Sequence, residues 1–220
     1  MATFSAYIGR NRKYQTLALL QLKREILGSN AVKQARTLTD KQLKMVLAHC
    51  ATRRHAARDR CIIMFSFLAG LRAKELAAIT VANVCDDRGE VRDEFVLAAN
   101  QTKGRKARRV YISSRLKREL ESYLKSVRLL RPRCAALFQS QKGAAFSANT
   151  MCQLFLNIYS ACGIDGASSH SGRRTFITTL AGKGVSVRVL AELAGHSSIA
   201  VTQRYIDVNE AQLKAAVELA

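Results

Sequence analysis

The sequence predicts a mostly α-helical fold with one small antiparallel β-sheet, an α+β class. In most of its 220 residues, apolar side chains recur at the three- to four-residue spacing of helices. Short β-branched runs separated by turn residues are confined to positions 81–112. With 48% hydrophobic residues, 24% charged residues and one proline, the composition is that of a globular protein and excludes extended disorder.

Helices are expected first in the N-terminal part of the chain. Positions 14–28 carry a short amphipathic pattern, too short to form a domain. A sharper helix start lies at Thr39, because Thr39 and Gln42 have the spacing of a capping box. Positions 58–68 are apolar on nearly every face, which predicts a buried helix, and Gly70 then turns the chain.

The pattern changes in the middle of the chain. Runs within 81–112 are expected to pair as strands of one small sheet, with turns at 86–89 and 103–106. Two further helices are predicted, one capped by Ser114 and one by Ser147. The last third of the sequence is also expected to be helical.

The charge balance indicates a polyanionic partner. The chain has 36 Lys and Arg against 16 Asp and Glu, a net charge of +20. Residues 102–133 hold twelve of the basic and two of the acidic side chains, half of the net charge. This clustering favours nucleic acid over a membrane surface, for which a basic helix with bulky apolar anchors is expected. No apolar run reaches the roughly 20 residues that span a bilayer.

The cysteine and acidic residues predict no metal centre. The six cysteines lack C-x-x-C spacing, so we expect reduced thiols in a cytoplasmic protein. The acidic residues within 86–94 are interpreted as solvated charges rather than metal ligands. No cofactor is predicted.

Two motifs in the last third of the chain contain candidate catalytic residues. His170-Ser171-Gly172-Arg173 opens a predicted helix, and Gly195-His196 is followed nine residues after the histidine by Tyr205. Upstream, Arg72 lies in the segment Gly-Leu-Arg-Ala-Lys-Glu-Leu, and Lys103 lies in a predicted turn. Each piece alone is a weak signal, but the ordered set with these spacings is specific.

These residue types fit the cleavage of a phosphodiester. Without a metal, that reaction requires cations for the phosphoryl oxygens, a nucleophile and an acid for the departing oxygen. Guanidinium groups such as those of Arg72 and Arg173 match phosphate oxygens in planar, two-point contacts. His170 precedes Arg173 by three residues, so both are expected on one face of the helix opening. A phenol such as Tyr205 is a candidate nucleophile where a positive field helps it lose its proton.

The ordered set consists of Arg72, Lys103, His170, Arg173, His196 and Tyr205. Its order and spacing resemble the catalytic signature of the tyrosine recombinases, the phage integrase family. The resemblance extends from about Arg36 to Val208 and is closest to Xer-type and phage integrases. It implies the tyrosine recombinase catalytic-domain fold and a site-specific recombinase or integrase. Such an enzyme breaks and rejoins DNA strands through a covalent 3′-phosphotyrosyl intermediate and needs neither metal nor ATP.

The resemblance also assigns roles to single residues. It makes Tyr205 the nucleophile, gives His170 a role in proton transfer and places His196 on a phosphate oxygen. It implies that Lys103 protonates the leaving 5′ oxygen. Lys106, or another member of the basic cluster at 103–109, remains an alternative for that acid.

Two further groups of residues have expected roles outside the reaction itself. Glu75 is predicted to support the arginine region rather than to react. The basic residues of the turn and of the following helix are expected to bind DNA, namely Arg105, Lys106, Arg108, Arg109, Arg115, Lys117 and Arg118.

The resemblance also suggests a domain organisation. Residues 1–35 are expected to be an N-terminal extension with one short helix and no complete core-binding domain. Residues 36–220 are expected to be the catalytic domain, with a C-terminal tail at 209–220. In the family such a tail packs in a neighbouring protomer, so the resemblance implies a homo-oligomer, a tetrameric synapse on DNA. The family's activity implies double-stranded DNA as the other partner. Accessory DNA-binding proteins are a further expected partner class. We therefore expect a cytoplasmic, nucleoid-associated protein that belongs to a mobile genetic element.

Three positions depart from the family pattern, and two other functions remain open. Gly172 stands where leucine is usual, Arg174 where Xer-type relatives often have histidine, and Tyr111 where many relatives have proline. One alternative function is a catalytically idle DNA-binding relative, or a remnant of a longer integrase. The other is a type IB topoisomerase, which shares the arginine, lysine, histidine and tyrosine chemistry.

Overall fold

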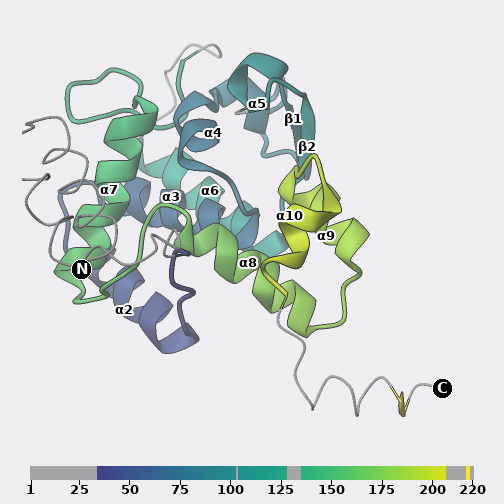
Figure 1. The fold of residues 1–220 in the computed structure, drawn as a ribbon. Helices are drawn as coiled ribbons and strands as arrows, with labels where there is room; N and C mark the ends of the chain where they lie inside the picture. The colour runs from purple at the N-terminus through teal and green to yellow at the C-terminus, as the bar shows by residue number, and fades with distance from the viewer. Residues whose placement is uncertain (1–33, 103, 128–134, 207–216, 219–220) are drawn as a thin grey trace, which may run out of the picture. The chain divides into compact units, whose positions relative to one another are not determined.

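The fold is built around one buried helix. The computed structural model describes residues 34–102, 104–127, 135–206 and 217–218. Helix α3 (Ala56–Leu68) lies in the middle and packs against α2 (Asp40–Ala51), α6 (Ser114–Ser126) and α8 (Ser171–Gly182), as Figure 1 shows. The side chains of α3 from Cys61 to Phe67 are buried. The predicted mostly helical fold with one small sheet is confirmed, and so is the buried helix.

The helix starts follow the local sequence. Thr39 caps α2, because its Oγ1 accepts from the Gln42 N–H at 3.3 Å while Gln42 Oε1 accepts from the Thr39 N–H at 3.0 Å. Ser147 caps α7 (Ala148–Ala161) through the Thr150 N–H at 3.1 Å. Both caps were predicted. The cap of α6 is Ser113, one residue before the predicted Ser114, since the Ser113 hydroxyl accepts from the Leu116 N–H.

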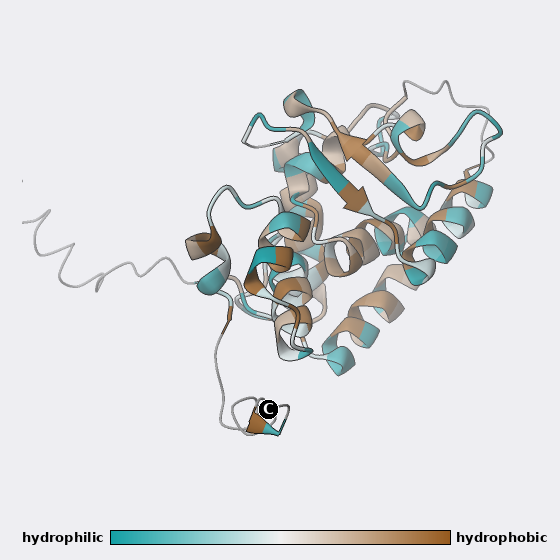
Figure 2. Ribbon diagram, turned by 90° about the vertical axis from the view of Figure 1, so that its right-hand side faces the viewer, coloured by the Kyte–Doolittle hydropathy of each residue, from teal (hydrophilic) through white to brown (hydrophobic). Residues whose placement is uncertain are grey.

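The sheet is smaller than predicted. In the described part of the chain one two-stranded sheet forms, in which β1 (Glu94–Leu97) pairs antiparallel with β2 (Arg108–Tyr111), with Phe95 opposite Val110 and Leu97 opposite Arg108. Figure 2 shows β1 largely apolar and β2 polar over its two arginines. Because side chains alternate between the two faces of a strand, Arg108 and Val110 share the inner face of β2.

The expectation of strands from position 81 was wrong. Val81–Val84 is a short helix, α5, because Asn83 lies three residues after Thr80 and its Oδ1 accepts from the Thr80 N–H at 2.9 Å. The turn at 86–89 closes only an isolated bridge between Cys85 and Val91. A polar capping residue therefore outweighed the β-branched pattern there.

Four short elements complete the described part of the fold. They are α4 (Ala73–Ala78), the 3₁₀ helix η2 (Ala99–Gln101), α9 (Val187–Ala194) and α10 (Ile199–Gln203). The predicted helix at 14–28, Lys103 and all of the tail except Val217 and Glu218 lie outside the described residues. Within the described part of the chain, no helix is long and apolar enough to cross a membrane.

Candidate active site

A pocket of about 640 Å³ gathers residues that are far apart in the sequence. Its lining includes Arg72 and Glu75 at the start of α4, Arg108 on β2 and the turn of Gly195 and His196 after α9. The loop that leads into β2 forms another part of the wall, with Thr102, Gly104 and Lys106. Figure 1 shows α9, α10 and the two strands side by side in this region.

Three arginines meet the C-terminal end of α9. Arg108 Nη1 donates to the Leu193 carbonyl at 2.8 Å, and Arg173 Nη2 donates to the Ala194 carbonyl at 2.5 Å. Arg72 Nη2 completes the row, 3.4 Å from the Gly195 carbonyl. The last carbonyls of a helix have no partner within the helix and carry its negative dipole end. The end of α9 therefore holds three guanidinium groups at one place.

Glu75 connects two of these arginines. Its carboxylate is fully buried and accepts from Arg72 Nη1 at 2.9 Å, from the Arg72 N–H at 2.8 Å and from Arg108 Nη2 at 2.8 Å. Burial alone raises the pKa of this carboxyl, but the charge of Arg108 and the bonds from Arg72 outweigh it and lower the pKa below its ordinary value. The predicted supporting role of Glu75 fits this geometry.

Arg173, bound to the Ala194 carbonyl next to the pocket-lining Gly195, is only 3% exposed. Its Nη1 donates to the Gly70 carbonyl at 2.7 Å, which fixes the chain just before Arg72. Burial first, and the nearby charges of Arg72 and Arg108 second, lower the pKa of this guanidinium to about 9. With one carboxylate among three guanidinium groups, the site carries excess positive charge that an anion such as phosphate would neutralise.

His196 is held by the turn at the end of α9. Gly195 has a left-handed backbone (φ +61°), and an added Cβ would lie 2.4 Å from Arg108 Cδ, so both the conformation and the packing require glycine. The His196 Nδ1 atom lies 2.7 Å from the hydroxyl of buried Thr202, which orients the ring. Burial and the charge of Arg173 lower the pKa of His196 to about 4, so the ring is neutral at pH 7.

Tyr205 lies next to His196. Their ring centres are 5.7 Å apart and their planes 19° apart, a stacked arrangement. The phenol also interacts electrostatically with Arg173, and the guanidinium of Arg174 lies over the ring, 5.8 Å from its centre. The site thus brings the candidate nucleophile beside the imidazole and the buried arginine.

Two predicted catalytic residues are placed differently. His170 is the N-cap residue of α8 and is exposed; like Arg173 and Tyr205, it is not among the residues that line the pocket. Lys103 lies outside the described residues, but its chain neighbours Thr102 and Gly104 both line the pocket. Lys106, the alternative acid, lines the pocket itself.

The predicted DNA-binding residues fall into two groups. Arg105, Lys106, Arg109, Arg115 and Arg118 are exposed, and Arg109 pairs with Glu94 on the outer face of the sheet. Lys117, partly exposed, pairs with Asp93 at 2.7 Å. Arg108 differs from the rest, because its side chain is 8% exposed and is bound to Glu75 and Leu193. The structure thus makes Arg108 part of the site rather than of the solvent-facing basic surface.

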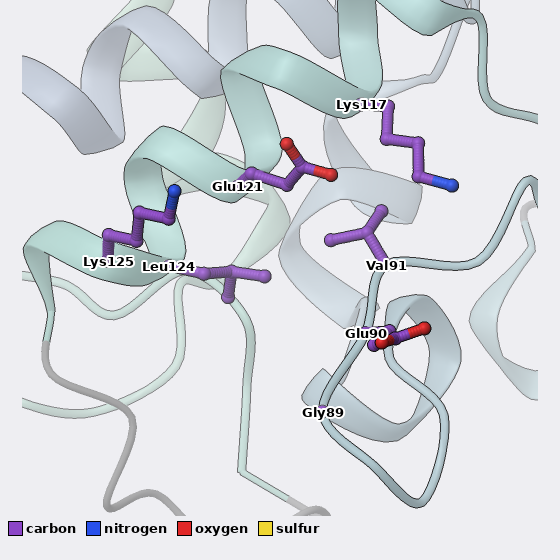
Figure 3. A pocket seen from close by; sticks show the side chains of 7 residues that line it. All are labelled: Gly89, Glu90, Val91, Lys117, Glu121, Leu124 and Lys125. Carbon is purple, nitrogen blue, oxygen red and sulfur yellow. The ribbon is translucent and has the colours of Figure 1, made fainter.

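A second hollow, of about 470 Å³, contains none of the predicted catalytic residues. Figure 3 shows Lys117, Glu121, Leu124 and Lys125 of α6 opposite Gly89, Glu90 and Val91. Its lining carries charges of both signs, and none of the described buried polar atoms without a partner belongs to a residue of this lining. Among the described residues, no three His, Cys, Asp or Glu side chains are grouped so that they could hold a metal ion.

Helix packing explains one departure from the family pattern. A Cβ at Gly172 would lie 2.3 Å from Ser66 Oγ and 2.8 Å from Phe67 Cδ2, because α8 approaches α3 closely there. The space of the usual leucine is therefore filled by α3. Nothing in the structure explains Tyr111, which is exposed on β2.

Solved structures of recombinases and integrases have the same fold. A XerA recombinase structure matches with a TM-score of 0.67 at 23% identity, over 83% of this chain and 64% of that one. XerH bound to palindromic difH substrate, a post-cleavage complex, matches with a TM-score of 0.64 at 21% identity, over 82% and 51%. At these identities the likeness shows the fold, that of tyrosine recombinase catalytic domains.

The chain belongs to the phage integrase family, whose model matches residues 36–212. Among curated proteins, tyrosine recombinase XerD of Neisseria meningitidis serogroup B is 31% identical over 185 residues. Tyrosine recombinase XerA of Pyrococcus horikoshii is 27% identical over 185 residues. These alignments cover 82% and 84% of this chain and 61% of each relative, so the chain spans about three fifths of their length. The predicted family and its Xer-type relatives are confirmed.

Proposed function

We propose that the chain is the catalytic part of a site-specific DNA recombinase that cleaves and rejoins strands through Tyr205. The observation that carries this proposal is the stacking of Tyr205 on His196, an imidazole that lies within the field of the guanidinium groups of Arg72, Arg108 and Arg173. A nucleophile and cations for phosphate oxygens are the parts that phosphodiester cleavage needs. Membership of the phage integrase family supports the same reaction.

The arginines supply the phosphate site in this proposal. Arg72 lines the pocket and its guanidinium contacts only one carboxylate, that of Glu75, in the described part of the chain. Arg173 lies so close to Arg72 that the positive charge of Arg72 helps to lower the pKa of Arg173. A bound phosphodiester would relieve that repulsion and accept charge-assisted hydrogen bonds. The same charges would stabilise the transition state, in which the phosphoryl oxygens carry more negative charge.

The family resemblance supplies the bond changes of the proposed reaction. The phenolic oxygen of Tyr205 attacks phosphorus, a 3′-phosphotyrosyl bond forms and the bond to the 5′ oxygen breaks. His170 is the proposed acceptor of the phenolic proton, and Lys103 is the proposed donor to the departing oxygen, with Lys106 as the alternative. His196 is neutral at pH 7 because its pKa is lowered to about 4, so it can donate one ring N–H to a phosphate oxygen.

Rejoining is the same reaction in reverse. A free 5′-hydroxyl attacks the phosphotyrosyl phosphorus and Tyr205 leaves. Because the phosphodiester energy is kept in the covalent bond, the proposal needs no ATP, and no step requires a metal. Attack by the 5′-hydroxyl of another strand gives recombination.

Double-stranded DNA is the proposed substrate. The net charge of +20 and the exposed basic residues after the pocket loop supply phosphate contacts. Structures of the same fold are complexes of a recombinase with difH substrate and of the Tn1549 transposon integrase with transposon right end DNA. A tetrameric synapse formed through the tail at 209–220, accessory DNA-binding proteins and a place at the nucleoid belong to the same proposal.

Trapping on DNA tests the function. The chain is incubated with a pool of nicked duplexes of random sequence, with and without excess chelator, and DNA that survives denaturant on the protein is sequenced. We expect trapped DNA with a shared sequence at the cleaved end, unchanged by the chelator. Arg173→Lys and Arg72→Lys should reduce trapping far more than binding, because a lysine cannot make the two-point contact.

Other outcomes identify the alternatives. Binding without any trapped DNA would indicate an idle DNA-binding relative. Trapped DNA with no shared sequence, together with relaxation of supercoiled plasmid, would indicate a topoisomerase. Trapping that stops when the chelator is added would contradict the proposed chemistry.

A further inference from the structure

Arg174 is a positively charged neighbour of Tyr205 to which the reaction scheme above gives no role. It follows Arg173 in the first turn of α8. Its guanidinium carbon lies over the Tyr205 ring, 5.8 Å from the centre. A guanidinium within about 6 Å of a ring centre is attracted to the negative face of the ring.

The environment of Arg174 favours this contact. Among the described side chains, none forms an ion pair with Arg174. Its Nε atom is buried without a hydrogen-bond partner. The guanidinium thus lies over the ring of Tyr205, and no carboxylate among the described residues neutralises its charge. Desolvation strengthens a cation–π contact.

The ring of Tyr205 therefore has two planar neighbours. His196, from the turn after α9, stacks on it, and Arg174, from α8, lies over it. The two neighbours come from different elements, so together they limit both the tilt and the displacement of the ring. A reacting group gains rate when it is already held near its attack geometry.

We propose that Arg174 is a positioning residue whose charged guanidinium holds the Tyr205 phenol beside His196. This inference rests on the function proposed above. Arginine differs here from the histidine that is common in Xer-type relatives, because arginine stays charged at every working pH and histidine is largely neutral above pH 7. Among the described residues, the charged Arg173 on α8 and the neutral, titratable His196 also face the phenol, and His170 lies one helical turn before Arg174.

The test compares three substitutions at one position on a DNA substrate recovered by trapping. Arg174→Met removes the charge at similar length, Arg174→Lys keeps the charge without the planar group, and Arg174→His restores the histidine that is common in the relatives. Arg188→Met, on the exposed face of α9, is the matched loss of one positive charge. For each protein we measure the single-turnover rate of adduct formation and the DNA affinity, and check folding by thermal unfolding.

We expect Arg174→Met to slow adduct formation by roughly 3- to 30-fold, the range of a cation–π contact converted to rate. DNA affinity should match that of Arg188→Met, whose rate stays at the wild-type value. Arg174→Lys should recover part of the rate. Relative to wild type at the same pH, Arg174→His should be faster at pH 6 than at pH 8, a dependence that a purely structural role would not produce.

Three outcomes overturn the inference. The first is a wild-type rate of adduct formation in folded Arg174→Met. The second is a loss of rate in that variant that equals its loss of DNA affinity. The third is a ratio of the Arg174→His rate to the wild-type rate that does not change with pH. If Arg174→Met does not fold, the lysine and histidine variants decide alone. Absence of an adduct with the wild-type chain would instead refute the proposed function, so the two failures are distinguishable.

Discussion

Replacing Arg108 with methionine tests whether this buried arginine holds the site together. The substitution removes the Arg108–Glu75 ion pair, with its 2.8 Å contact, and the 2.8 Å hydrogen bond to the Leu193 carbonyl. Methionine keeps most of the apolar length that packs against Gly195. The expected loss of stability is therefore electrostatic rather than a cavity effect.

The expected loss of stability depends on the contacts that Glu75 keeps after the substitution. Removing one partner of a buried ion pair costs about 3–5 kcal/mol. Glu75 keeps both of its bonds to Arg72, and the repulsion among the three guanidinium groups falls when one of them is removed. We therefore expect a free energy of unfolding lower by about 2–3 kcal/mol. For a chain of this size, that corresponds to a fall in Tm of about 5–10 °C.

The assay is urea and thermal unfolding with a neighbouring control. Arg109→Met makes the same substitution one residue further along β2. It removes an exposed ion pair, because the side chain of Arg109 is 55% exposed and that of Glu94 is 43% exposed. Such surface pairs are worth about 0–1 kcal/mol. A double-mutant cycle with Glu75→Gln should give a coupling energy of at least about 1 kcal/mol. Equal losses for Arg108→Met and Arg109→Met, or additive effects in the cycle, would refute the reasoning.

Three smaller predictions concern the glycines and the histidine. Gly195→Ala should cost about 2–4 kcal/mol in urea unfolding, since it adds a clash to left-handed strain, whereas Gly184→Ala (φ +81°, open space) should cost only about 1–2 kcal/mol. Gly172→Ala should destabilise by about 1–3 kcal/mol, and a Ser66→Gly background should recover part of this loss. Because the pKa of His196 falls from 6.5 to about 4 on folding, the unfolded chain binds the extra proton between these values and stability drops as pH falls. Between pH 7 and pH 5 the drop due to this half-exposed ring should be about 1 kcal/mol, and absent in His196→Gln; an equal drop in both proteins would contradict it.

Local sequence signals were sufficient for much of the fold. The capping box at Thr39 and the capping residue Ser147 predicted where α2 and α7 begin. The apolar run at 58–68 predicted the central helix, because a helix that is hydrophobic on all sides must be buried. The strand prediction from position 81 failed because β-branched residues can be buried in a strand or in a helix. Here the local cap formed by Thr80 and Asn83 favoured the helix.

The site was predicted in part. Motif order indicated Arg72, Arg173, His196 and Tyr205, and the structure brings these four together. Arg108 was read as a DNA contact, although alternation along β2 places it on the same face as buried Val110 and could have indicated burial. The carbonyls of Leu193, Ala194 and Gly195 could not be found from sequence. Their role depends on three arginines from distant elements meeting one helix end.

Thr202 shows a second limit of sequence reasoning. Its hydroxyl orients the His196 ring from α10, at a distance of 2.7 Å. A single threonine in a helix carries no pattern that separates this role from ordinary packing. Only the turn at Gly195, which brings α9 and α10 together, gives it that role.

The most direct test of the central claim is to identify the amino acid that carries trapped DNA. A nicked duplex is cleaved by the chain, the adduct is digested with protease and nuclease, and the modified peptide is identified by mass spectrometry. We predict the nucleotide on Tyr205, and no adduct with Tyr205→Phe although DNA binding persists. Tyr159 is the internal comparison, because it is 1% exposed and burial raises the pKa of its phenol, which makes it a poor nucleophile. DNA attached to Tyr159 or to any residue other than Tyr205, or an adduct that persists in Tyr205→Phe, would contradict the account.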